Sequence, residues 1–256
     1  MRKLRIAVYK FASCDGCQLQ LLNLEEELLD LVKYVEFAMF YEATSDNKPG
    51  PYDVAFIEGA VSTPHEEEIV KEARREAKIV VAIGACATAG GIQALRNWAS
   101  VEEYKKYVYP NPEWIEVLEK ARPISDYIKV DYEIRGCPVS KYQLSYFIRQ
   151  LLIGKRPTLP SDSVCMECKM KGNICLMVTR GIPCLGPVTM AGCGALCPGY
   201  GRGCYGCYGP MVDPKPKALA QTLLEKGLSR KDIALLFKSF TGWSKQFREV
   251  VDEYGR

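Results

Sequence analysis

The sequence lacks the features that mark several common classes of protein. It has a single histidine, His65, which excludes most metal chemistry that depends on histidine ligands. No apolar run approaches the ~18 residues of a membrane span, since the most apolar stretch, residues 77–91, ends in glycines. Residues 1–10 do not read as a secretory signal. Lysine and arginine are scattered, without a basic stripe. We therefore expect a cytoplasmic protein with no membrane segment and no nucleic-acid partner.

Cysteine, by contrast, is abundant, with twelve among 256 residues. Without an export signal, so many cysteines favour metal binding over disulfides, because the cytoplasm keeps thiols reduced. Soft thiolates select zinc or iron–sulfur clusters, and twelve divides into three sets of four. Four thiolates on a cubane core of charge +2 leave about −2 per site, so three sites would move the formal net charge from +3 to about −3.

Strand-like and helical segments alternate over the first part of the chain. The predicted strands are residues 4–10, 35–41, 54–59, 77–84 and 127–134. Helices are predicted over residues 19–32, from a Thr63-Pro64-His65-Glu66 start to about residue 77, and over residues 140–153. This alternation predicts an α/β fold with a doubly wound parallel sheet.

The character of the sequence changes near Gly154. Residues 155–163 read as a linker, and residues 165–207 hold eight cysteines with many glycines and prolines but no clear periodicity. Two short helices separated by Gly227 and a polar tail are expected after Pro214. We predict two domains: the sheet domain over residues 1–155, and an irregular domain over residues 156–256 that folds around its metals and ends in helices.

Four cysteines follow predicted strands: Cys14 and Cys17 follow the first, Cys86 the fourth and Cys137 the fifth. The carboxyl ends of parallel strands form the ligand-binding edge of such sheets, so these thiols should converge. They would hold an iron–sulfur cluster or zinc. The alternative is that Cys86 and Cys137 are free core cysteines. Glu58, after the third strand, either faces this site or is a solvated turn carboxylate.

The other eight cysteines lie in the second part. They are Cys165, Cys168, Cys175, Cys184, Cys193, Cys197, Cys204 and Cys207. A structural zinc site is an alternative, but Cys168 and Cys204 are separated by 35 residues, against 15–20 between the pairs of a zinc ribbon. Three clusters in one small protein indicate electron transfer between distant partners.

Six motifs carry a family resemblance. They are CDGC (14–17), GACATAGG (84–91), GCP (136–138), CLGP (184–187), CGALCP (193–198) and CYGC (204–207). In this order they resemble the small subunit of nickel–iron hydrogenases, over about residues 4–210. The resemblance implies a flavodoxin-like sheet domain and an electron-transfer role in a hydrogenase. It implies no catalytic residue in this chain, because the nickel–iron centre lies in a separate large subunit.

The resemblance also implies the ligands of three 4Fe–4S clusters. These are Cys14, Cys17, Cys86 and Cys137 for the proximal cluster, Cys193, Cys197, Cys204 and Cys207 for the medial one, and Cys165, Cys168, Cys175 and Cys184 for the distal one. The partners implied are the large subunit and diaphorase-type subunits that carry iron–sulfur clusters and bind flavin or NAD(P), in a heterotetramer.

The sequence departs from the family pattern at three informative positions. Cys165 stands where many members have histidine, and Cys197 where many have proline, which implies cubanes at all three sites. Gln18 stands where many have a glutamate assigned to proton transfer, and it cannot ionise. These departures resemble the cytoplasmic class that couples hydrogen to NAD(P) or a deazaflavin, in particular sulfhydrogenase subunits of the delta type.

Other functions fit part of the pattern. The chain could be a free-standing ferredoxin-like carrier or binding module, or a zinc-stabilised scaffold. Cluster subunits of the complex I type share the sheet, but the resemblance implies a single cluster there, and the eight further cysteines argue against it. We also expect Tyr200, Tyr205 and Tyr208 to shield clusters from water, and His65 to have no chemical role.

Overall fold

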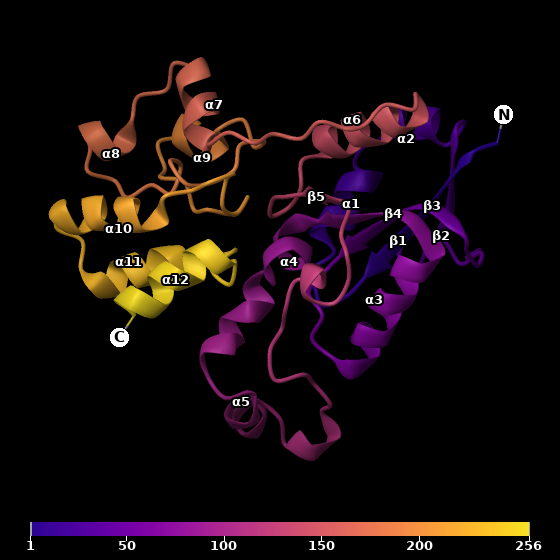
Figure 1. The fold of residues 1–256 in the computed structure, drawn as a ribbon, viewed down its shortest axis with the longest axis horizontal. Coiled ribbons are helices and arrows are strands. Elements are labelled where there is room, and N and C mark those ends of the chain that lie inside the picture. The colour runs from indigo at the N-terminus through magenta and orange to yellow at the C-terminus, as the bar shows by residue number, and fades with distance from the viewer. Residues whose placement is uncertain (1, 256) are drawn as a thin grey trace.

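The computed structural model describes residues 2–255, and its first part is built on a five-stranded parallel sheet (Figure 1). The strands are β1 (Leu4–Lys10), β2 (Val35–Phe40), β3 (Tyr52–Glu58), β4 (Ala77–Ile83) and β5 (Tyr132–Ile134). They lie in the order β2-β1-β3-β4-β5, and every neighbouring pair is parallel. This is the doubly wound order of flavodoxin-like folds, so the predicted fold class is confirmed.

Twelve α-helices and three 3₁₀ helices complete the described residues. The α-helices are α1 (Gly16–Leu22), α2 (Glu26–Leu31), α3 (Pro64–Glu76), α4 (Gly84–Ala89), α5 (Val101–Val108), α6 (Lys141–Leu152), α7 (Val164–Met170), α8 (Leu176–Thr179), α9 (Leu196–Gly199), α10 (Pro216–Glu225), α11 (Arg230–Phe237) and α12 (Lys245–Tyr254). The 3₁₀ helices are η1 (Ile92–Trp98), η2 (Pro112–Trp114) and η3 (Ile124–Asp126). Residues 2–255 contain no helix long and apolar enough to cross a membrane.

Both faces of the sheet are covered, which explains the uninterrupted apolar strands. Ile6 and Val8 of β1 point into a core formed with α1, α2 and α6, whereas Ala7 and Tyr9 point into a second core formed with α3 and α4. Successive strand residues face opposite sides, so a strand buried on both faces needs apolar residues throughout. The helical crossovers therefore leave only the two ends of the strands free for polar chemistry.

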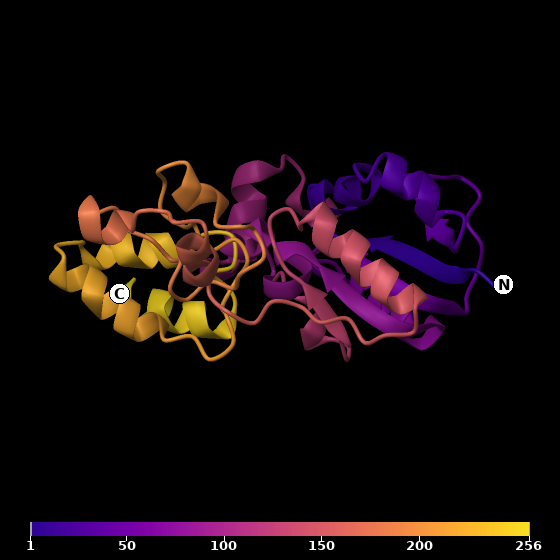
Figure 2. The same ribbon diagram turned by 90° about the horizontal axis from the view of Figure 1, so that it is seen from above.

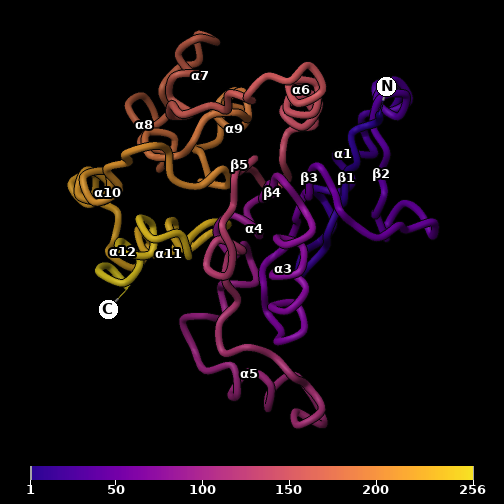
Figure 3. The backbone as a smooth tube through the Cα atoms, turned by 45° about the vertical axis from the view of Figure 1, so that its right-hand side comes forward, coloured from indigo at the N-terminus to yellow at the C-terminus, as the bar shows by residue number. Residues whose placement is uncertain are grey.

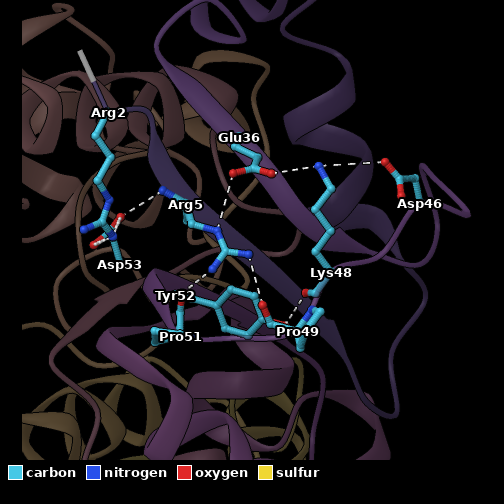
Figure 4. Close-up of polar contacts among 9 residues, drawn as sticks. All are labelled: Arg2, Arg5, Glu36, Asp46, Lys48, Pro49, Pro51, Tyr52 and Asp53. Carbon is cyan, nitrogen blue, oxygen red and sulfur yellow. Dashed lines mark hydrogen bonds and ion pairs between the residues drawn. The ribbon is translucent and has the colours of Figure 1, made fainter.

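The amino ends of the strands are held by a network of charged groups (Figure 4). The Arg5 guanidinium donates to the carbonyl oxygens of Pro49 and Pro51 at 3.0 and 2.8 Å, and its Nε lies 3.4 Å from a carboxylate oxygen of Glu36. The backbone N–H of Arg5 donates to the Asp53 carboxylate at 3.0 Å. This network ties β1 to the start of β2 and β3, at the end of the sheet opposite the cysteines.

Two predicted elements in this part differ from the structure. The helical run over 19–32 is broken between α1 and α2, where Glu25 has a φ of 53° that no helix interior allows. The fifth strand is shorter than predicted and begins at Tyr132. Asp131 accounts for this, because its side chain accepts from the backbone N–H of Val80 at 2.8 Å and from the Arg74 guanidinium, in place of further strand pairing.

The second part of the chain gathers at the opposite end from β1–β3 (Figures 1 and 2). Helices α10, α11 and α12 form its core, with Phe237 stacked edge-on against Phe247. The predicted polar tail is wrong, since α12 buries Phe247, Val250, Val251 and Tyr254. Their i, i+3, i+4, i+7 spacing is helical, but the charged residues between them mask it. Trp98 of η1 packs on this core from the sheet side.

Asp53 offers a test of the amino-end network. Burial works against its ionisation, but Lys78, at 2.8 Å, and the N–H of Arg5 hold the pKa of this carboxyl below its ordinary value. The carboxylate therefore stabilises the fold above the unfolded-state pKa of about 4, and the contribution is lost as the pH falls. Asp53→Asn should cost about 1–2 kcal/mol at neutral pH, a loss of about 2–8 °C in the thermal midpoint.

Asp46→Asn is the matched control. Its carboxylate is 82% exposed and lies 3.9 Å from Lys48, so the thermal midpoint should stay within about 1 °C of the parent. Equal losses for the two variants would show that the Asp53 network does not contribute to stability.

Candidate metal centres

Four cysteines meet at the carboxyl edge of the sheet, and we call them the edge group. Cys14 and Cys17 lie at the start of α1, Cys86 lies in α4 directly after β4, and Cys137 follows β5. Burial raises the pKa of the Cys86 thiol to about 12, and the neighbouring Cys137 and Cys14 add to this. Burial, then Glu58, Cys86 and Cys137 raise the pKa of Cys17. The structure therefore brings these thiols together, as the strand arrangement predicted.

Two glycines keep space open beside the edge group. A Cβ at Gly84 would collide with the Sγ of Cys17, and a Cβ at Gly91 would lie 2.5 Å from the Sγ of Cys86. Both glycines have positive φ, of 84° and 60°, which a residue with a side chain adopts only at a cost. The loops after β4 thus bring backbone against the thiols without filling the space around them.

Glu58 is part of this site rather than a solvated turn residue. It is 1% exposed, and its carboxylate accepts from the backbone N–H groups of Cys17 at 3.0 Å and Gln18 at 3.3 Å. Burial raises its pKa, while these hydrogen bonds oppose the rise. The Gln18 side chain is also 1% exposed, and neither its amide oxygen nor its amide nitrogen has a hydrogen-bond partner within residues 2–255. A buried, non-ionisable amide therefore sits beside the first pair of thiols.

A second set of thiols, the outer group, surrounds α7 and α8. Cys165 and Cys168 lie on α7, Cys175 caps α8, and Cys184 lies in the loop that follows. Burial raises the pKa of Cys165 to about 11, and Cys184, Cys168 and Cys175 add to it in that order. Cys175 is exposed. The outer group therefore lies close to the molecular surface.

The middle group is formed by the last four cysteines. Burial raises the pKa of Cys207 to about 12, with Cys193 and Cys197 among its charged neighbours. Burial likewise raises the pKa of Cys204 to about 12, with Cys184 of the outer group and then Cys207 as its thiol neighbours. These four thiols come from α9 and the loops on either side of it, and Cys204 is buried.

The middle group contacts both of the others. Cys137 of the edge group is a close neighbour of the Cys207 thiol in the middle group. The N–H of Cys204 in the middle group donates to the Sγ of Cys184 in the outer group at 3.1 Å. The middle group, although last in the sequence, therefore lies between the other two.

The donor set fits iron–sulfur chemistry. All twelve cysteines lie within the described residues and none forms a disulfide. No three His, Cys, Asp or Glu side chains in residues 2–255 converge tightly enough to hold a single metal ion. A cubane calls for sulfurs spread around a four-iron core, with four soft thiolates as donors. Each group supplies those four thiolates, whereas their role as ligands stays a prediction.

The three tyrosines near the thiols differ in how far their side chains are buried. Tyr208 is buried against Gly136 and Gly192, and burial raises its pKa, with Cys193 and Cys207 adding to the rise. Tyr200 is 82% exposed and Tyr205 41%, so the expected shielding is found only for Tyr208. His65 is exposed in the first turn of α3.

Sequence reasoning missed Glu167, which joins two of the groups. It lies on α7 between Cys165 and Cys168 and accepts from the backbone N–H groups of Gly192 and Ala195, beside Cys193. Its position inside a C-x2-C motif was the only signal, and such a position predicts no contact.

Known proteins resemble the chain in both parts. The family model of the NADH ubiquinone oxidoreductase 20 kDa subunit matches residues 14–151. Sulfhydrogenase 2 subunit delta of Pyrococcus furiosus is 37% identical over 240 residues, which cover 94% of this chain and 100% of the relative. A subunit of the F420-non-reducing hydrogenase vhu of Methanocaldococcus jannaschii is 36% identical, and the match covers 80% of this chain and 81% of the relative.

A solved structure of an NAD+-reducing [NiFe]-hydrogenase in the H2-reduced state contains a similar chain. It is 35% identical with a TM-score of 0.58, and the similarity covers 62% of this chain and 96% of that one. The sheet, the cysteine motifs and the relatives over nearly the whole length agree. The chain therefore belongs to the NADH ubiquinone oxidoreductase 20 kDa subunit family, alongside the delta subunit of sulfhydrogenase and its counterparts in F420-non-reducing hydrogenases.

Proposed function

We propose that this chain is the electron-transfer subunit of a soluble nickel–iron hydrogenase and that it holds three 4Fe–4S clusters. The edge group would hold the proximal cluster, the middle group the medial one and the outer group the distal one. The observation that carries the proposal is the order of the three thiol groups: Cys207 lies beside Cys137, and the N–H of Cys204 donates to the Sγ of Cys184 at 3.1 Å. Each cluster, when bound, would accept and pass on one electron at a time.

The chain's own residues prepare the sites for clusters in two ways. Burial raises the pKa of the thiols of Cys17, Cys86 and Cys204, so binding a cluster, which needs thiolates, would release protons. The backbone N–H of Cys204 donates to the Sγ of Cys184 at 3.1 Å, and that of Gly206 donates to the Sγ of Cys204 at 3.5 Å. Hydrogen bonds to sulfur and exclusion of water are two of the factors that set cluster potentials.

One end of the chain suits a large subunit that carries a nickel–iron centre. Cys14 is exposed, and Leu19 and Ile92, which lie next to the edge group, are 51% and 55% exposed. Exposed apolar side chains around a redox site favour a permanent protein interface. We expect the large subunit to bury them and to close the edge group from water.

The other end suits a second redox partner. Around the exposed Cys175, the side chains of Met170, Ile174 and Val178 are 80%, 65% and 73% exposed. We propose that a diaphorase-type subunit, with its own clusters and a flavin that reduces NAD(P), binds here and completes a cytoplasmic heterotetramer. The similar chain of the NAD+-reducing hydrogenase supports this acceptor.

The second candidate is a carrier that works without a fixed large subunit. The exposed outer group favours docking to several redox proteins. Purification under anaerobic conditions distinguishes the two, because only the hydrogenase subunit should bring a nickel-containing partner with it in a fixed ratio.

The metal content of the purified complex is the first test. Three cubanes predict about twelve iron and twelve acid-labile sulfide per chain, with nickel confined to the large subunit. Anaerobic elemental analysis and a sulfide assay measure both. About four iron with two zinc would restrict redox chemistry to the edge group and contradict the relay.

Two cysteine variants test the order of the clusters. Cys137→Ser should damage the cluster nearest the nickel–iron centre and abolish hydrogen-dependent dye reduction by the complex. Cys165→Ser should leave hydrogen–deuterium exchange at the large subunit intact and slow only the exit of electrons. Equal loss of isotope exchange in both variants would mean that the assigned order is wrong.

Gly84→Ala tests whether the edge group needs the space that Gly84 leaves open beside its thiols. The added methyl would collide with the Sγ of Cys17 at a φ of 84°, so the complex should lose about four irons per chain, one cubane. Gly154→Ala is the control, since Gly154 has a similar φ of 71° but no atom within 4 Å of an added Cβ. It should keep the full iron content, and iron loss in both variants would point to backbone strain instead.

A further inference from the structure

Helix α7 belongs to the outer group through its cysteines but also contacts the middle group. The Oε1 of Glu167 accepts from the backbone N–H of Gly192 at 2.9 Å, and its Oε2 accepts from that of Ala195 at 3.2 Å. These two amides bracket Cys193. The same Oε2 lies 3.9 Å from the Cys193 Sγ. A carboxylate between the ligands of one group therefore binds the loop of the next.

The loop around Cys193 needs such a contact. Gly192, Gly194 and Ala195 all have positive φ, of 129°, 64° and 50°. Ala195 is not a glycine, so its own Cβ disfavours this left-handed backbone. Backbone N–H groups in such a loop form a concavity that binds anions. Glu167 supplies that anion from a different element and compensates for the strain.

Lys171 places a cation on the same loop. Gly194 follows Cys193, and a Cβ added to Gly194 would lie 3.0 Å from the Nζ of Lys171. Lys171 follows Glu167 by four residues, so both side chains extend from one face of the helix. Helix α7 thus sets one negative and one positive charge against the loop that carries Cys193.

We infer that Glu167 and Lys171 are positioning residues for the middle group. Glu167 holds the Cys193 loop in its strained conformation, and the two charges move the reduction potential of the cluster there in opposite directions. A nearby carboxylate opposes the added electron and lowers the potential, whereas a nearby ammonium favours the electron and raises it. The effect on potential rests on the proposed function, while the hold on the loop does not.

The test uses the assembled, cluster-loaded complex with three single variants. EPR-monitored redox titration should show one cluster with a raised midpoint in Glu167→Gln, and the same cluster with a lowered midpoint in Lys171→Gln. The other two clusters should be unchanged. Glu225→Gln is the charge-matched control, because that carboxylate lies on α10 and accepts from Gln221 of the same helix, and it should shift no cluster. Unchanged midpoints in both test variants, or shifts in different clusters, would overturn the inference.

Hydrogen–deuterium exchange tests the hold on the loop without reference to clusters. Loss of the Ala195 hydrogen bond in Glu167→Gln should speed exchange in a peptide covering residues 190–197 by about tenfold. Lys171→Gln and Glu225→Gln should not change it. An unaltered exchange rate in Glu167→Gln would overturn the inference that Glu167 holds the Cys193 loop. If the Glu167→Gln complex does not assemble, the midpoint of the Lys171→Gln complex alone tests the effect on the reduction potential. A complex that contains no clusters would refute the proposed function, whereas the exchange measurement would still test whether Glu167 holds the Cys193 loop.

Discussion

The convergence of parallel strands at one edge of the sheet is the constraint on which the rest of the molecule depends. Because β1, β4 and β5 all run in the same direction, the residues that follow them meet although they are far apart in the chain. The opposite edge is closed by the charged network around Arg5 and Asp53 (Figure 4). Only the carboxyl edge is left free, and it holds the edge group with Glu58 buried among its thiols.

The second part of the chain depends on this edge for its position. Cys137, which ends the edge group, lies beside Cys207, and Tyr208 packs against Gly136. Cys204 of the middle group belongs to the hydrophobic core that α10, α11 and α12 build, and Cys168, Cys184 and Cys193 pack against it. Figure 3 shows α7, α8 and α9 above that core, beyond the end of the sheet. Since so much of the segment 165–207 consists of thiols, glycines and loops, its folding is expected to be coupled to metal binding.

The linkage between groups has a chemical consequence beyond proximity. A relay works when successive sites are close and each has a potential suited to its neighbours. Here the middle and outer groups are joined by a backbone amide, and Glu167 extends the outer group's helix onto the middle group's loop. The outer and middle groups are therefore connected by hydrogen bonds of the protein itself. The family model matches residues 14–151, and the sulfhydrogenase relative extends over both parts, so the linked second part is shared with hydrogenase subunits.

Residue patterns were enough to predict the class of fold and the meeting of Cys14, Cys17, Cys86 and Cys137, whereas the division of the other eight cysteines came from the family resemblance. Apolar runs bounded by turns specify strands, and a C-x2-C motif has a local geometry that needs no distant contact. The tertiary contacts were needed to show that β5 is short because Asp131 replaces its pairing and that α12 is buried. The same holds for the orphaned amide of Gln18 and for the loop contact of Glu167. Each of these depends on which surfaces meet in space, and residue spacing along the chain does not encode that.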